Sequence, residues 1–149
     1  MIMKRIVIIV LACALAFCFA SCSDNSTDRA ISGIVNLCNE KRAEEGLGAL
    51  TLDENLSQNA SVRAEETARE GCFSHIRPDG SGCFTAITSD YTAAGENLAE
   101  GKPDAQEIVS AWMASEAHRN NIMNRNFGKI GLAFYEKDGV YYLAALFTD

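Results

Sequence analysis

The sequence predicts a single domain of the α/β class, folded as a three-layer α/β/α sandwich with a small, mostly antiparallel central sheet. Two observations carry this prediction. Residues 129–136 and 140–147 are apolar segments that flank the turn residues Asp138-Gly139, the pattern of a β-hairpin. The second segment is apolar on both faces, so its sheet needs helices above and below it. Three helical segments come before the hairpin and can supply these two layers.

Two helices are expected in the first half of the chain. The first runs from about residue 28 to residue 45 and is ended by Gly46 and Gly48. The second begins at the capping box Thr51-Leu52-Asp53-Glu54 and is stopped by Gly71. Its apolar stripe has helical spacing and consists of Leu52, Leu56, Ala60 and Ala64.

Residues 72–101 are irregular and rich in Gly, Ser and Thr, with a short strand expected to lead to Gly95. A third helix is expected to begin at Pro103-Asp104, because proline and an acid both suit a first helical turn. Its buried face consists of Ala105, Ile108, Val109 and Trp112. We assign Trp112 to the core and expect His118 on a connecting turn just past this helix.

The first 21 residues have the composition of an export signal. Lys4 and Arg5 precede an apolar stretch, residues 6–19, that is too short for a convincing membrane-spanning helix. Residues 19–22, Phe-Ala-Ser-Cys, resemble a bacterial lipobox, so we expect lipidation of Cys22. Cleavage after Ala20 and a retained anchor helix are the alternatives. Residues 22–29 then form a polar tether and residues 30–149 the domain, exported and held at the outer face of the bacterial membrane, or secreted.

The charge of the processed chain limits its partners. Without Lys4 and Arg5 the chain carries 11 basic and 20 acidic residues, a net charge of −9. This balance argues against binding nucleic acid and against binding anionic lipid headgroups by charge. We therefore expect the chain to touch the membrane through its lipid anchor only, and we separately expect a monomer.

Three cysteines fall in the predicted domain. In the oxidising environment of an exported chain, Cys72 and Cys83 could close a disulfide across residues 74–80, and two free thiols are the alternative. Cys38 lies on the apolar stripe of the first helix with Ile31, Ile34 and Val35. It is interpreted as a small buried hydrophobe.

Both histidines of the chain lie in short polar segments, residues 74–80 and 112–122, and Gly95-Glu96-Asn97 is a third such segment. Two imidazoles and one or two carboxylates could together bind a divalent metal or move a proton. The Arg77-Pro78-Asp79-Gly80 sequence is interpreted as a structural turn. Asn97 and Asn121 are expected to bond backbone beside the site.

These segments resemble the bacterial branch of the CAP superfamily, which includes cysteine-rich secretory proteins, antigen 5 and plant pathogenesis-related proteins. The resemblance runs from about residue 31 to residue 147 and rests on four motifs in order: residues 36–42 with Gly46-Leu47, residues 74–80, residues 95–97 and residues 112–122. It implies an α/β/α sandwich with a central cleft that holds two histidines and two acids, where some members bind a divalent metal.

By motif, His75, Glu96 and His118 match three of the four cleft positions. Glu116 resembles the second acid, although bacterial members usually carry Pro or Gly there and the spacing differs by one residue from the eukaryotic motif. The last strand also departs from the family, since Leu143-Ala144-Ala145 stands where an aromatic residue and a glutamine are common.

Two functions remain open. His75, Glu96 and His118 with an open fourth position have the composition of a catalytic Zn²⁺ site, or one for another divalent cation. Alternatively, they form a hydrogen-bonded polar cluster without metal. The preferred function is a binding module for a lipid, peptide or envelope component, with a cleft formed by His75, Glu96, His118, Glu116 and Asn97. The other is a metal-dependent hydrolase with Glu116 as possible base, and Arg119 is expected to pair with Glu96 or Glu116.

Overall fold

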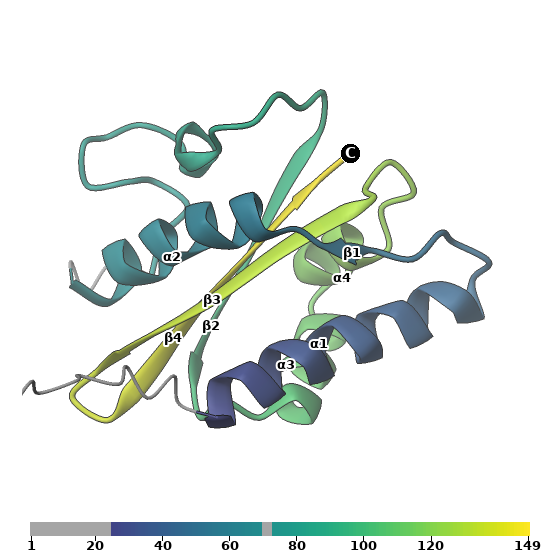
Figure 1. Cartoon of the computed structure of the whole chain (residues 1–149), viewed down its shortest axis with the longest axis horizontal. Coiled ribbons are helices and arrows are strands. Elements are labelled where there is room, and N and C mark those ends of the chain that lie inside the picture. Colours follow the sequence, from purple (N-terminus) through teal and green to yellow (C-terminus); the bar gives the residue numbers. More distant parts are fainter. Residues whose placement is uncertain (1–24, 70–72) are drawn as a thin grey trace, which may run out of the picture.

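The computed structural model describes residues 25–69 and 73–149, and the predicted signal, Cys22, Gly71 and Cys72 lie outside them. The element order begins with helices and ends with the hairpin (Figure 1). In chain order the elements are α1 (Asn25–Glu44), β1 (Thr51–Leu52), α2 (Glu54–Arg69), the 3₁₀ helix η1 (Cys83–Ala86), β2 (Ala94–Gly101), α3 (Ala105–Ala114), α4 (Glu116–Ile122), β3 (Lys129–Lys137) and β4 (Val140–Thr148).

The four strands form one sheet in the order β1-β3-β4-β2. The pairs β3–β4 and β4–β2 are antiparallel, and only the two-residue β1 runs parallel to its neighbour β3. The sheet is therefore mostly antiparallel, as predicted. The hairpin turn also agrees with its sequence, because Asp138 (φ 55°) and Gly139 (φ 81°) both adopt the left-handed conformation that a two-residue hairpin turn requires.

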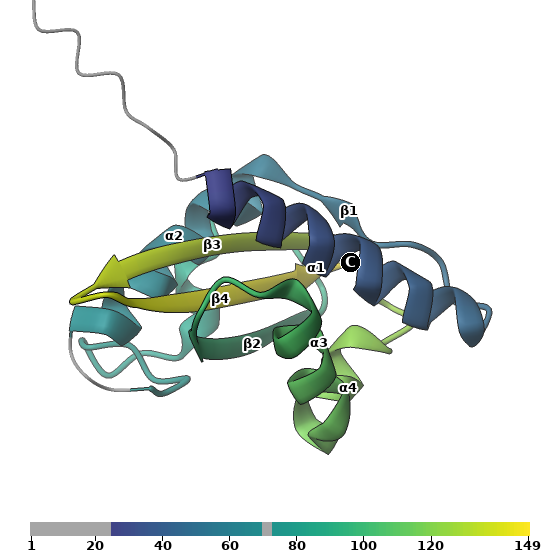
Figure 2. The same cartoon turned by 90° about the horizontal axis from the view of Figure 1, so that it is seen from below.

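Alternation along β4 divides the core between two faces of the sheet. Leu143, Ala145 and Phe147 join the core cluster formed with α1, α3 and α4. Ala144 and Leu146 join a second cluster formed with α2. In Figure 1, α2 lies above the diagonal strands and the other three α-helices below them, and Figure 2 shows the four strands side by side. The predicted α/β/α sandwich is confirmed.

Three local predictions were wrong. Helix α1 begins at Asn25 rather than near residue 28, so part of the predicted tether is helical. Thr51-Leu52 is not a helix cap but a strand, because the Thr51 and Asp53 amides donate to the Gly128 and Ile130 carbonyls at the edge of β3. The cap of α2 is Asp53, whose Oδ1 accepts from the Leu56 amide at 2.8 Å, and Leu52 is exposed.

The third difference concerns His118. It lies within the short helix α4, not on a turn. This helix carries one fully buried residue, Ile122, and has no apolar stripe that the sequence could reveal. Helix α3 begins as predicted, with the Asp104 carboxylate accepting from the Glu107 amide at 3.0 Å.

Helix α2 packs closely on β3 at Gly131. A Cβ added at this glycine would overlap the backbone of Leu56 in the first turns of α2. The glycine is required by this approach and not by its backbone conformation. It sets the distance between α2 and the sheet, and so the position of the α2 side chains that reach the candidate site.

A buried guanidinium ties α1 to the chain after α4. Arg42 is 1% exposed and donates to the carbonyl oxygens of Gly48, Ile122, Asn124 and Phe127 at 2.6–2.9 Å. Four acceptors replace the water that this charged group loses. Within the described ranges, no helix has both the length and the hydropathy needed to cross a lipid bilayer.

Candidate functional site

The candidate site is built on an ion pair between helix α2 and strand β2. Glu96, which follows Gly95 on β2, points to the α2 side of the sheet, where Arg63 donates from Nε to Glu96 Oε2 at 2.8 Å. Arg63 Nη2 adds a longer bond to Glu96 Oε1 at 3.3 Å. Both side chains are 1% exposed. Such a pair is stable when buried only because each group has further partners.

Arg63 has two of these further partners. Its Nη1 donates to Glu66 Oε2 at 2.6 Å and its Nη2 to the Ser74 carbonyl at 2.7 Å. Glu66 also accepts from Arg77, at 2.8 Å from Nη2. Burial by itself would raise the pKa of Glu66, but the bonds from Arg77 and Arg63 outweigh it and lower that pKa. Arg63 and Arg77 thus hold the 74–80 segment against α2.

The 74–80 segment forms the predicted turn. The Gly80 amide donates to the Arg77 carbonyl at 2.9 Å, and Gly80 has a φ of 86°, which favours glycine. The Cys83 amide donates to the His75 carbonyl at 2.9 Å. This bond places the side chains of His75 and Cys83 next to each other above β2.

His75 joins the ion pair through its ring. Nδ1 lies 2.7 Å from Glu96 Oε1, and because a carboxylate only accepts, Nδ1 carries the hydrogen. The His75 side chain is 58% exposed, so the site opens to solvent on this side. Cys83 lies below it as a buried thiol, whose pKa is raised to about 11 by burial, with the charge of Glu96 and a hydrogen bond to its carboxylate adding to the effect.

His118 approaches from the opposite face of the sheet, on α4. Burial, followed by the charge of nearby His75, lowers the pKa of His118. The ring is therefore neutral at neutral pH, with one nitrogen to donate and one to accept. Asn97 supports it from below, because its Nδ2 donates to the His118 carbonyl at 3.1 Å. Asn121 in turn donates to the Glu96 carbonyl and to Asn97 Oδ1.

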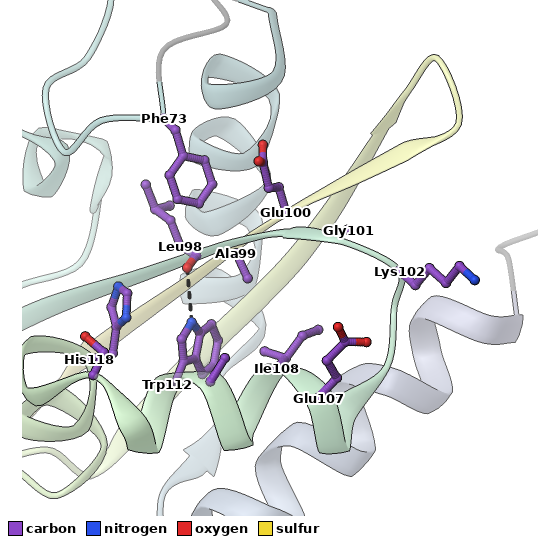
Figure 3. Close-up of a pocket in the computed structure, with 12 residues that line it drawn as sticks. Phe73, Leu98, Ala99, Glu100, Gly101, Lys102, Glu107, Ile108, Trp112 and His118 are labelled. Carbon is purple, nitrogen blue, oxygen red and sulfur yellow. Dashed lines mark hydrogen bonds between the residues drawn. The ribbon is translucent and has the colours of Figure 1, made fainter.

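A groove of about 400 Å³ runs from His118 along β2 (Figure 3). Its walls are largely apolar, formed by Phe73, Leu98, Ile108, Ala111 and Trp112. The Trp112 indole donates to the Leu98 carbonyl at 3.0 Å, which fixes the ring as one wall. His118 lies near one end and the charged residues Glu100, Lys102 and Glu107 near the other. Trp112 is thus core, as predicted, but also part of this groove.

Comparison with known proteins agrees with this geometry. The family model described as "CAP: Cysteine-rich secretory protein family" matches residues 35–148. The chain belongs to the CAP family. YkwD of Bacillus subtilis (strain 168) is 37% identical over 111 residues, which are 72% of this chain and 43% of that protein. The membrane protein YlbC of the same organism is 27% identical over 70% of this chain and 31% of its own length. The CAP chain thus spans less than half of either relative.

Solved structures share the fold. An outer surface protein from Borrelia burgdorferi superposes with a TM-score of 0.75 at 23% identity, covering 83% of this chain and 94% of that one. An extracellular protein with an SCP domain from Bacillus anthracis gives 0.72 at 25% identity, covering 81% of this chain and 40% of that one. These superpositions support the sandwich fold of the CAP domain.

The structure brings together only some of the residues expected in the CAP cleft. His75 and Glu96 are in contact, and His118 and Asn97 lie beside them. Glu116 is exposed on α4, outside the residues that line the groove. The prediction for Arg119 was wrong: its guanidinium donates to the Met113 carbonyl at 3.0 Å, and the carboxylate of Glu96 is taken by Arg63 instead.

Of the two predictions about cysteines, one is confirmed and the other is not tested. Cys38 is fully buried, and burial raises its pKa to about 12, which confirms an inert hydrophobe. Cys83 is a free thiol in this structure, while Cys72 lies outside the described residues. Their disulfide stays a prediction.

Sequence reasoning missed Arg63 and Glu66, which organise the site. A signal was present, because a second stripe of polar residues follows the apolar stripe of α2 at helical spacing: Asn59, Arg63, Glu66 and Thr67. Three of them are buried. A buried polar stripe on a helix that faces a sheet indicates a polar partner on that sheet, here Glu96.

One set of three side-chain donors at the CAP site fits a divalent metal. One ligand atom each from His75, Cys83 and Glu96 lie within 4.8 Å of one another, the only such group of three among the described residues. It contains the thiol of Cys83 in the place that the sequence had assigned to His118. A metal held there would polarise a bound water or carbonyl.

Proposed function

We propose that this CAP domain is an exported binding module and that its ligand lies in the groove along β2. The observation that supports this most is the groove itself, which joins apolar walls to a neutral imidazole at one end. Its volume of about 400 Å³ falls within the range of small-molecule sites. The ligand would be a lipid, a peptide or another envelope component with an apolar body and a polar end.

The wall residues supply the apolar part of this recognition. Trp112 is 2% exposed and held by its bond to Leu98, so it forms a rigid backing for the groove and loses no side-chain freedom on binding. Phe73 is 49% exposed at the mouth of the groove and would become covered by a ligand. Exposed aromatic rings beside a concave surface are typical of binding sites.

His118 supplies the polar contact. Its pKa is lowered, so the neutral ring offers both a donor and an acceptor to a hydroxyl or amide of the ligand at neutral pH. Glu100, Lys102 and Glu107 at the other end carry both signs of charge, so charge alone does not select an anionic or a cationic ligand. We therefore define the ligand by its amphipathic character rather than by its net charge.

If the ligand binds in the groove, a bulky side chain placed there should block binding. Ala111 lines the groove and is exposed on α3, so Ala111→Phe adds a ring to the cavity without disturbing the core. We expect it to weaken binding of a dansylated fatty acid at least about tenfold, a loss of about 1.4 kcal/mol. The readout is energy transfer to the dansyl group from Trp112, the only tryptophan of the chain.

The matched control is Ala114→Phe, because Ala114 is also exposed on α3 but does not line the groove. Equal binding by the two variants, or no transfer with the unmodified chain, would count against the groove as the binding site. Circular dichroism of both variants checks that α3 remains folded.

We also propose export with a lipid anchor at Cys22. The structural relatives include an outer surface protein and an extracellular protein, which supports export of this chain as well. Residues 19–22 resemble a lipobox. Replacing Cys22 by Ser is expected to release the protein from the membrane fraction into the medium, measured by immunoblotting of fractionated cells. Retention of the variant in the membrane would contradict lipidation at this residue.

A metal-dependent hydrolase is the second candidate, supported by the donor group of His75, Cys83 and Glu96. Glu116, the possible base, is exposed on α4 and is not one of the three donors. This function requires hydrolysis of a peptide or ester that a chelator abolishes. Metal-loaded protein that cleaves neither class of substrate would exclude it.

A further inference from the structure

We infer that the CAP domain lies against the lipid bilayer with one defined end, formed by the first turn of α1 and by the connection from β2 to α3. We call it the anchor end, and it comprises residues 25–29 and 101–107. The inference rests on the proposed lipid anchor at Cys22. The partner of this surface is the bilayer itself, and the contact sets the direction in which the groove opens.

The chain between the lipid anchor and the domain is short. Cys22 stands three positions before Asn25, where α1 begins. Three residues reach at most about 11 Å, even when fully extended. Helix α1 has 20 residues and is therefore about 30 Å long. The start of α1 thus stays at the lipid surface, whereas Glu44 at its other end can lie a full helix length away.

The start of α3 lies beside the start of α1. Arg29 and Gln106 line the same surface pocket, one from each helix. The two helices also pack closely here, because a Cβ added at Gly33 would lie only 2.8 Å from the Cβ of Ala105. Residues 101–107 are therefore held next to the first turns of α1, and a short anchor brings both segments to the bilayer.

The tip of the β3–β4 hairpin lies at the same end of the domain. Figures 1 and 2 both show the tip on the side where α1 begins and where β2 passes into α3. The pairing of Gly101 with Tyr141 places the end of β2 beside the first residues of β4. Val140, directly after the turn, is 38% exposed and offers an apolar side chain for contact with lipid.

One end of the groove belongs to the anchor end. Lys102 and Glu107 line the groove at the start of α3, and His118 lines it beyond the end of α3 (Figure 3). The groove therefore opens beside the lipid surface and runs away from it. A lipid that leaves the bilayer moves headgroup first, so its polar end would reach His118 while its apolar chain remains between the walls. This direction agrees with the polar contact proposed for His118.

Energy transfer to the membrane tests the orientation. The lipidated full chain is reconstituted in phosphatidylcholine vesicles that contain a rhodamine-labelled lipid, because the anchor end carries both signs of charge and needs no anionic headgroup. A nitrobenzoxadiazole dye is attached to one introduced cysteine. Cys38 and Cys83 are buried thiols with raised pKa values, so they stay unlabelled, and Cys72→Ser removes the third thiol of the domain.

Two pairs of exposed positions compare the ends of the domain. Gln106→Cys places the dye at the anchor end, and Glu45→Cys places it just past the other end of α1. We expect transfer from position 106 to exceed transfer from position 45 at least about twofold, because a helix length of about 30 Å separates the two ends. Arg29→Cys and Glu44→Cys, both on α1, form the second pair and should show the same order.

Equal transfer from both ends, or stronger transfer from positions 44 and 45, would overturn the orientation and leave the lipid anchor and the groove standing. A full chain that does not stay with the vesicles would contradict the anchor at Cys22 and this inference together. Binding of the dansylated fatty acid to the Cys22→Ser chain in solution reports on the groove separately. The two proposals can therefore fail independently.

Discussion

Replacing Arg63 by methionine is expected to lower the free energy of unfolding by about 3–5 kcal/mol, because the variant leaves the Glu96 carboxylate buried without its cation. Arg63 is 0% exposed and bonds Glu96, Glu66 and the Ser74 carbonyl. Methionine fills a similar volume, so the loss comes from charge and hydrogen bonds rather than from a cavity. Urea unfolding followed by Trp112 fluorescence measures it.

Two further variants separate the ion pair from a general effect of the substitution. Arg69→Met lies on the same helix, where Arg69 forms an exposed pair with Glu65, and should leave the midpoint of urea unfolding nearly unchanged. The double variant Arg63→Met, Glu96→Gln should regain about 1–3 kcal/mol of the loss, because the unpaired charge is gone. The single variant Glu96→Gln completes the comparison. If the stability lost in the double variant equals the sum of the losses in Arg63→Met and Glu96→Gln, then Arg63 and Glu96 do not stabilise each other.

Gly131→Ala is expected to cost about 3 kcal/mol, at the upper end for overpacking, or to prevent folding. The added methyl group would overlap the backbone of Leu56, which cannot turn aside as a flexible side chain can. Either α2 moves away from β3 or the strand bends, and each opens the core around Ala60 and Leu146. The loss is measured as a lower midpoint of urea unfolding.

Gly128→Ala is the matched control for this substitution. Gly128 comes just before β3, and a methyl group there meets no atom within 4 Å. Its stability should stay within about 0.5 kcal/mol of the unmodified chain. Equal losses at Gly128 and Gly131 would indicate an effect of glycine replacement on the unfolded chain and not a close approach of α2.

The sequence predicted the elements whose residues repeat with a clear period. The two apolar strands, the turn at Asp138-Gly139 and the apolar faces of α1 and α3 all follow from local pattern, and the sandwich follows from the two-sided burial of β4. Helix α4 has no such pattern, and its position depends on partners far along the chain, such as Asn97. The sequence did not predict strand β1, because Thr51 also suits a helix cap.

The site was predictable in part for a similar reason. Motifs identified His75, Glu96 and His118, but a motif does not tell which donors converge. The proximity of Cys83 to Glu96 results from the folding back of the 74–83 loop, and the partner of Glu96 is an arginine 33 residues earlier. Such pairings depend on tertiary packing, to which sequence spacing gives no direct access.

The guanidinium of Arg42 has a consequence for the order in which the chain folds. Three of its four acceptors, the carbonyls of Ile122, Asn124 and Phe127, lie 80–85 residues later in the chain. During synthesis α1 is made first. Burial of its Arg42 guanidinium is unfavourable until the chain that carries these carbonyl acceptors has been synthesised. Docking of α1 therefore waits for α4 and the start of β3, and folding of this domain completes only when nearly the whole chain is available.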